Sequence, residues 1–190
     1  MIDLPSWVSW SLFGLAASSI CAIIGLSIFA VLSGKFQFFP PPSGDSWQHR
    51  TFMAMFRLFL YPLLALSLLD FKPVAPADAV LQYTVGLVLL VVGFALAFWI
   101  TFQMGWRNAF GEKHGLKTTG WFSISRNPVY VATWVGMIGW SLLANTLLVW
   151  ILLTLWAAMY LLAPIFEEPW LEQQYGQDYL DYKRQTRRFL

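Results

Sequence analysis

Long apolar runs without charge constrain this chain more than any other feature. Residues 7–32 and 79–102 contain no charged side chain, and residues 52–69 contain only Arg57. An α-helix needs about 20 apolar residues to cross the hydrocarbon core of a bilayer. The composition agrees, because 58% of the residues are hydrophobic and only 12% are charged, against about 25% charged in soluble domains. We therefore expect a single membrane domain over residues 1–190.

The fourth apolar run, residues 128–162, is too long for one crossing and is interpreted as two. Asn145 and Thr146 lie at its middle and are the residues there that favour a turn. This pattern predicts a tight helical hairpin made of residues 128–144 and 147–162. The expected fold is therefore an all-α polytopic membrane protein with five transmembrane helices.

The distribution of lysine and arginine supports five crossings. Cytoplasmic loops of membrane proteins are enriched in these two residue types. With five helices, ten of them fall on one side, and the other side carries only Lys72. The ten are Lys35, Arg50, Arg107, Lys113, Lys117, Arg126, Lys183, Arg184, Arg187 and Arg188. We expect the N-terminus outside and the C-terminus in the cytoplasm.

A further helix is predicted after the fifth crossing. Pro164 can end the preceding helix, and Pro169 can open a new one. The apolar and aromatic residues beyond it recur at helical spacing, namely Leu171, Tyr175, Tyr179 and Tyr182. This pattern predicts a C-terminal amphipathic helix that lies at the membrane surface.

Polar residues concentrate in two segments that flank the hairpin, residues 106–130 and 167–188. The ends of a hairpin are adjacent in space, so the two segments must meet. Carboxylates as close to the bilayer as Glu167 and Glu168 are costly and tend to mark a functional site or an ion pair. At a helix C-terminus they also oppose the helix dipole, so Arg126 or a cationic ligand group should compensate them. Two simpler alternatives stay open: the glutamates end a helix among the headgroups, and the arginine binds lipid phosphate.

Other kinds of site find little support. Cys21 is the one cysteine and cannot form an intrachain disulfide. His49 and His114 lack the spacing of metal ligands, so we expect no metal site. A net charge of +2 does not indicate nucleic-acid binding. No arrangement of serine or cysteine with histidine and aspartate suggests a nucleophile.

Both polar segments resemble one family. Residues 114–122, HGLKTTGWF, and residues 125–130, SRNPVY, are similar to the first half of its signature. Residues 167–171, EEPWL, followed by Tyr175, Gly176, Tyr179 and Tyr182, are similar to the second half. The family is the isoprenylcysteine carboxyl methyltransferase-like group, which also takes in membrane phospholipid methyltransferases. The likeness covers residues 106–188.

The resemblance implies a membrane methyltransferase that uses S-adenosyl-L-methionine without a Rossmann domain. The catalytic half would be residues 104–190, with the cofactor between the hairpin ends and the C-terminal helix. By position, the cofactor-binding residues would be His114, Gly115, Leu116, Lys117, Phe122, Asn127, Pro128, Val129, Tyr130 and Glu167. Glu167 would face the amino group of the cofactor. Arg126, Glu167 and Glu168 would be the catalytic residues.

The acceptor is expected to be a lipid-like or small amphiphilic molecule that enters from the bilayer. A sulfonium methyl donor is already activated, so we expect catalysis mainly by alignment and exclusion of water. Carboxylate, amine, thiol and lipid headgroup all stay open as the methyl acceptor. Two alternative functions also stay open: an NADPH-dependent membrane reductase of the sterol reductase type, and a non-enzymatic membrane scaffold or transporter.

Overall fold

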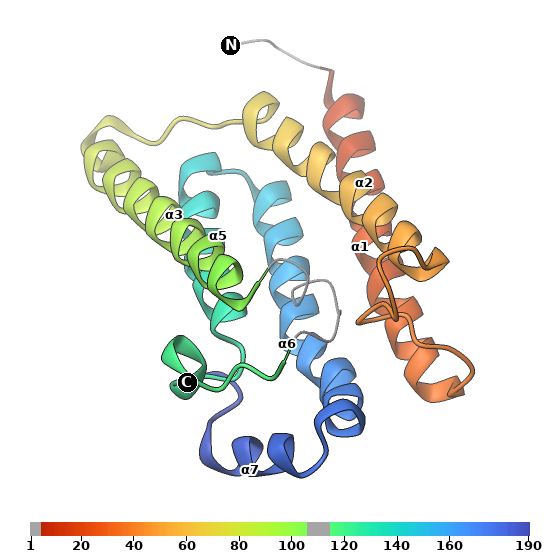
Figure 1. Ribbon diagram of the computed structural model, residues 1–190. Coiled ribbons are helices and arrows are strands. Elements are labelled where there is room, and N and C mark those ends of the chain that lie inside the picture. Colours follow the sequence, from red (N-terminus) through yellow and green to blue (C-terminus); the bar gives the residue numbers. More distant parts are fainter. Residues whose placement is uncertain (1–4, 106–114) are drawn as a thin grey trace.

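The described part of the chain is built from helices (Figure 1). The computed structural model describes residues 5–105 and 115–190. Its elements are α1 (Ser6–Ser33), α2 (Trp47–Leu69), α3 (Pro76–Met104), the short 3-10 helix η1 (Gly120–Ser123), α5 (Pro128–Ala144), α6 (Leu147–Tyr175) and α7 (Gln177–Gln185). Among these residues, β-pairing is confined to one isolated bridge between Ser125 and Arg187. The predicted all-α architecture is confirmed for this part of the chain.

Four helices, α1, α2, α3 and α6, are long and apolar enough to cross a membrane. The fifth predicted crossing, α5, has 17 residues and is about 26 Å long at 1.5 Å per residue. The predicted hairpin turn is confirmed, because α5 ends at Ala144 and α6 begins at Leu147. Asn145 forms this turn in the left-handed conformation, with φ 51°, which asparagine tolerates well.

The predicted helix boundary near Leu162 is wrong. The last long helix, α6, runs through Pro164 and Pro169 and ends only at Tyr175. Each interior proline removes one backbone hydrogen bond. The buried side chains around them, including Phe166, offset this loss by packing against the rest of the bundle. The break comes instead at Gly176, whose φ of 53° and ψ of −126° favour glycine.

The helices pack as two pairs joined by α6, which contacts α1, α2 and α5. The pair of α3 and α5 is held by glycines at close approach. A Cβ atom at Gly139 would lie 2.2 Å from the backbone nitrogen of Leu90, and one at Gly93 would lie 2.2 Å from that of Gly136. The absence of side chains at these positions lets the two backbones touch. This contact fixes α5, whose first turn carries part of the site described below.

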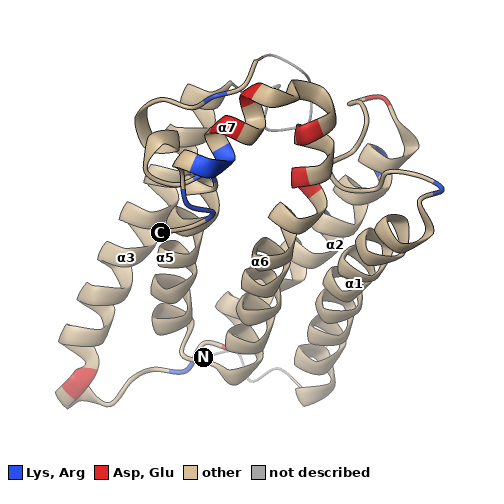
Figure 2. Cartoon of the chain, turned by 90° about the horizontal axis from the view of Figure 1, so that it is seen from below, with Lys and Arg blue, Asp and Glu red and all other residues tan. Residues whose placement is uncertain are grey.

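Charged residues gather at one end of the bundle, around α7 and the adjoining loops, and are sparse at the opposite end (Figure 2). The short helix α7 carries Asp178, Asp181, Lys183 and Arg184, while its Tyr179 and Tyr182 are buried. Its aromatic face therefore packs onto the protein. The described residues of the two polar segments that the sequence singles out, 115–130 and 167–188, lie at this end.

Candidate functional site

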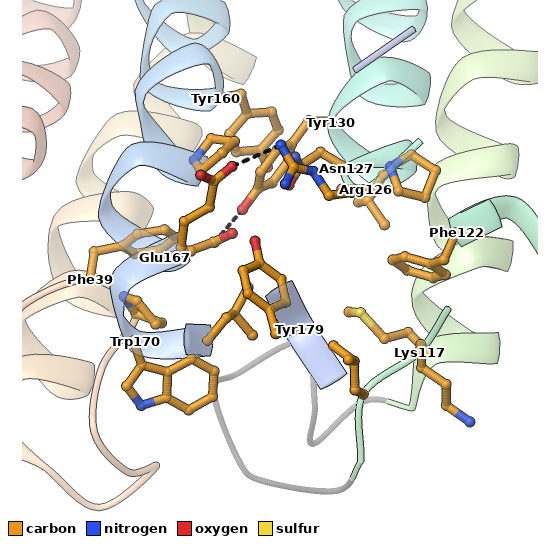
Figure 3. Close-up of a pocket in the computed structure, with 18 of the residues that line it drawn as sticks. Phe39, Lys117, Phe122, Arg126, Asn127, Tyr130, Tyr160, Glu167, Trp170 and Tyr179 are labelled. Atoms are coloured by element: carbon orange, nitrogen blue, oxygen red, sulfur yellow. Dashed lines mark hydrogen bonds and ion pairs between the residues drawn. The ribbon is translucent and has the colours of Figure 1, made fainter. Parts of the chain in front are cut away.

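A cavity of about 460 Å³ opens at the charged end of the bundle (Figure 3). All predicted site residues that the structure describes line it. They are Gly115, Leu116, Lys117, Phe122, Arg126, Asn127, Pro128, Val129, Tyr130, Glu167 and Glu168. His114 was also predicted, and it lies outside the described residues. The cavity brings together segments from both sides of the hairpin.

Direct contacts join the two polar segments. The Arg126 NH2 atom lies 3.2 Å from Glu168 Oε1, and the Tyr130 hydroxyl donates a 2.5 Å hydrogen bond to Glu167 Oε1. The segments therefore meet, as the sequence predicts from the hairpin. The roles expected for their side chains stay predictions.

Glu168 is surrounded by three cations. Arg188 forms two parallel hydrogen bonds with both carboxylate oxygens, a bidentate pair that we call the fork. Its Nε atom lies 2.8 Å from Oε1 and its NH2 atom lies 3.0 Å from Oε2. Lys183 Nζ lies 3.1 Å from Oε2, and Arg126 takes a remaining position on Oε1. The residue is only 6% exposed. A buried carboxylate is tolerated when it is paired in this way. Glu168 therefore holds these three basic side chains close together.

Arg126 has hydrogen-bond donors that no described residue uses. Its side chain is 9% exposed, and its Nε and NH1 atoms are buried without a hydrogen-bond partner among the described residues. Buried N–H groups are nearly always paired in native proteins. Because Arg126 lines the cavity, its unused N–H groups are suited to an anionic group of a ligand.

Glu167 offers the opposite charge in the same cavity. Its hydrogen bond in the described structure comes from Tyr130, whose ring stacks on Tyr160 at a centroid distance of 4.4 Å. Figure 3 shows these three side chains together, with the Tyr179 hydroxyl pointing toward them. A carboxylate has about four acceptor positions, so Glu167 keeps capacity for a cationic or N–H-bearing ligand group.

Sequence reasoning missed part of the cavity wall. The loop between α1 and α2 and the first turns of α2 line it with Phe39, Pro40, Pro41, Phe52, Met53 and Phe56. In the sequence, the first three belong to a stretch with three consecutive prolines, and the other three belong to the apolar run of residues 52–69. Prolines are common in loops and apolar residues are common in spanning helices, so neither pattern indicates a cavity wall.

Two of the three cations around Glu168, Lys183 and Arg188, also escaped sequence reasoning, which used them only to orient the chain. The hydrogen bonds that Lys183 donates to Glu172 and Glu168 raise its pKa, and the hydrogen bond that Arg188 donates to Glu168 raises the pKa of Arg188. Burial raises the pKa of Tyr182 to about 12, and its hydroxyl donates a 2.6 Å bond to the Phe122 carbonyl. At neutral pH these groups therefore keep the charge states that the contacts need.

Residues 81–178 match the family model described as phospholipid methyltransferase. The chain belongs to the phospholipid methyltransferase family. Membership implies a membrane methyltransferase with a lipid-like substrate, and it does not favour the reductase, scaffold or transporter alternatives. The match extends from α3 through the hairpin into α7, and so includes most of the cavity wall. No curated protein and no solved structure shows significant similarity to the chain.

Proposed function

We propose that this phospholipid methyltransferase family member binds S-adenosyl-L-methionine in the cavity and methylates a lipid-like acceptor. One observation carries the proposal. A single cavity holds a guanidinium with unused donors, Arg126, and a carboxylate with unused acceptor capacity, Glu167. The amino-acid end of the cofactor carries one carboxylate and one ammonium group, which these two residues complement.

The rest of the cavity also suits this cofactor. A volume of about 460 Å³ falls in the range of about 300–1,000 Å³ that is typical of small-ligand sites. Phe122 and Tyr179 supply aromatic surface, and residues 115–117 also line the cavity. The apolar wall formed by Phe52 and Phe56 suits an acceptor with an acyl or other apolar part.

The side chains of this site would act mainly by positioning the cofactor and the acceptor. When bound, the cofactor supplies an electrophilic methyl group on a positively charged sulfur. Glu167 and Arg126 would hold the two charged ends of its amino-acid part, and Glu168 would hold Arg126 in place. Aromatic walls would exclude water from the reacting atoms. A dedicated base is needed only for a protonated acceptor, and this assignment requires none.

The membrane arrangement follows the charges. We place all five apolar helices, including the short α5, across the bilayer, with the charged end in the cytoplasm. In this arrangement Arg126, Glu167 and Glu168, which belong to the proposed catalytic half at residues 104–190, lie near the cytoplasmic opening of the cavity. The water-soluble cofactor would then come from the cytoplasm and the acceptor from the bilayer. Ten basic residues on one side against Lys72 on the other support this orientation.

The direct test is transfer of a labelled methyl group from S-adenosyl-L-methionine into a total lipid extract by the purified protein. We expect one labelled lipid product, whose structure identifies the acceptor. A parallel thermal-shift comparison uses S-adenosylhomocysteine and NADPH. Stabilisation by NADPH alone, or by neither ligand, would refute the proposal.

A further inference from the structure

The tail segment, residues 186–190, packs against the segment that carries Arg126. The Arg126 backbone N–H donates a 2.9 Å bond to the Arg187 carbonyl, and the Asn127 side chain donates a 2.8 Å bond to the Arg188 carbonyl. The ring of Phe189 lies 5.0 Å from that of Trp134 on α5. The tail lies beyond the residues that carry the family match, yet it contacts the site at several points.

The Arg188 side chain reaches Glu168, where it competes with Arg126 for the same carboxylate. Arg188 holds the two-oxygen fork, with one nitrogen on each oxygen. Arg126 is left with a single contact through NH2 at 3.2 Å. A fork with two parallel bonds is the preferred geometry of an arginine–carboxylate pair. Without Arg188, the Arg126 guanidinium would be the nearest arginine able to form that fork.

If Arg126 formed the fork with Glu168, it would use the N–H donors that are now unpaired in the cavity. A fork made by Arg126 needs a second nitrogen in addition to NH2, and that nitrogen must be Nε or NH1. Both of these nitrogen atoms are buried and lack a hydrogen-bond partner in the part of the chain that the structure describes. Arg188 therefore keeps Glu168 neutralised while leaving Arg126 available to a ligand.

We propose that Arg188 is a positioning residue, which occupies the Glu168 fork so that Arg126 keeps its Nε and NH1 donors for the anionic group of the bound ligand. The inference rests on the proposed function, in which that group is the carboxylate of the cofactor. The raised pKa of Arg188, caused by the Glu168 hydrogen bond, agrees with a permanent contact.

The experiment measures the affinity of S-adenosylhomocysteine for the full chain by calorimetry in detergent. Loss of one charge-assisted bond weakens binding by about tenfold or more, so we expect this loss in Arg188→Ala. Arg188→Lys keeps the charge but cannot form the fork, and should fall between Arg188→Ala and the original protein. Arg187→Ala is the matched control, because its side chain is exposed and has no ion pair in the described structure. It should bind within about twofold of the original.

A double-mutant cycle separates positioning from a structural role. In a Glu168→Gln background no carboxylate remains to capture Arg126, so adding Arg188→Ala should cost less than about threefold. Equal losses in both backgrounds, or unchanged affinity in Arg188→Ala, would overturn the positioning role. Failure of the unaltered protein to bind S-adenosylhomocysteine would instead overturn the proposed function, and this inference with it. If Arg188→Ala does not fold, Arg188→Lys in the two backgrounds decides the question.

Discussion

Replacement of Glu167 by glutamine tests the charge assignment of the cavity most directly. The substitution keeps the size of the side chain, and the amide oxygen can still accept the bond that Tyr130 donates at 2.5 Å. The local packing should therefore persist. The change removes the negative charge that we assign to the ammonium group of the cofactor.

The magnitude follows from the kind of bond that is lost. A hydrogen bond to a charged group contributes about 1.5–3 kcal/mol, which corresponds to about 10- to 150-fold in affinity. The half-buried position of Glu167 and its single hydrogen bond in the described structure leave its charge little screened by other protein groups. We expect S-adenosylhomocysteine to bind Glu167→Gln more than tenfold more weakly.

Calorimetry of the detergent-purified protein is the assay, and Glu172→Gln is the matched control. Glu172 lies on the same helix, pairs with Lys183 at 2.8 Å, and does not line the cavity. It should bind the ligand within about twofold of the original protein, because surface ion pairs contribute little. Equal affinity of Glu167→Gln and the unaltered protein would refute the charge assignment.

Two further predictions concern stability. Gly139→Ala places a Cβ atom 2.2 Å from the Leu90 nitrogen and should lower the Tm by several degrees through overpacking of about 1–3 kcal/mol, whereas Gly25→Ala, with open space around it, should not. The Tyr182 hydroxyl has its pKa raised to about 12 by burial, so its bond to Phe122 should stabilise the fold fully below about pH 10 and be lost as the pH rises toward 12. Thermal unfolding from pH 9 to 12 should therefore show less alkaline destabilisation in Tyr182→Phe, and identical profiles would contradict this.

The sequence by itself determined the helical membrane architecture and the meeting of the two polar segments. Apolar length and turn residues are local properties, and they located the hairpin turn at Asn145 within a residue. Once the hairpin is accepted, the proximity of Arg126 and Glu168 follows from connectivity alone. The family motifs lie on the same two segments, so the sequence alone was enough to predict which residues would form the site.

Only the tertiary structure decided which charges pair and what closes the cavity. The five-helix prediction puts ten basic residues on one side, and nothing in their spacing indicates that Lys183 and Arg188 reach Glu168. Which charged side chains form ion pairs depends on distances across the fold, and the spacing of residues in the sequence does not give these distances. The continuation of α6 through Pro164 is likewise a result of packing, because burial of its neighbours offsets a local preference for a break.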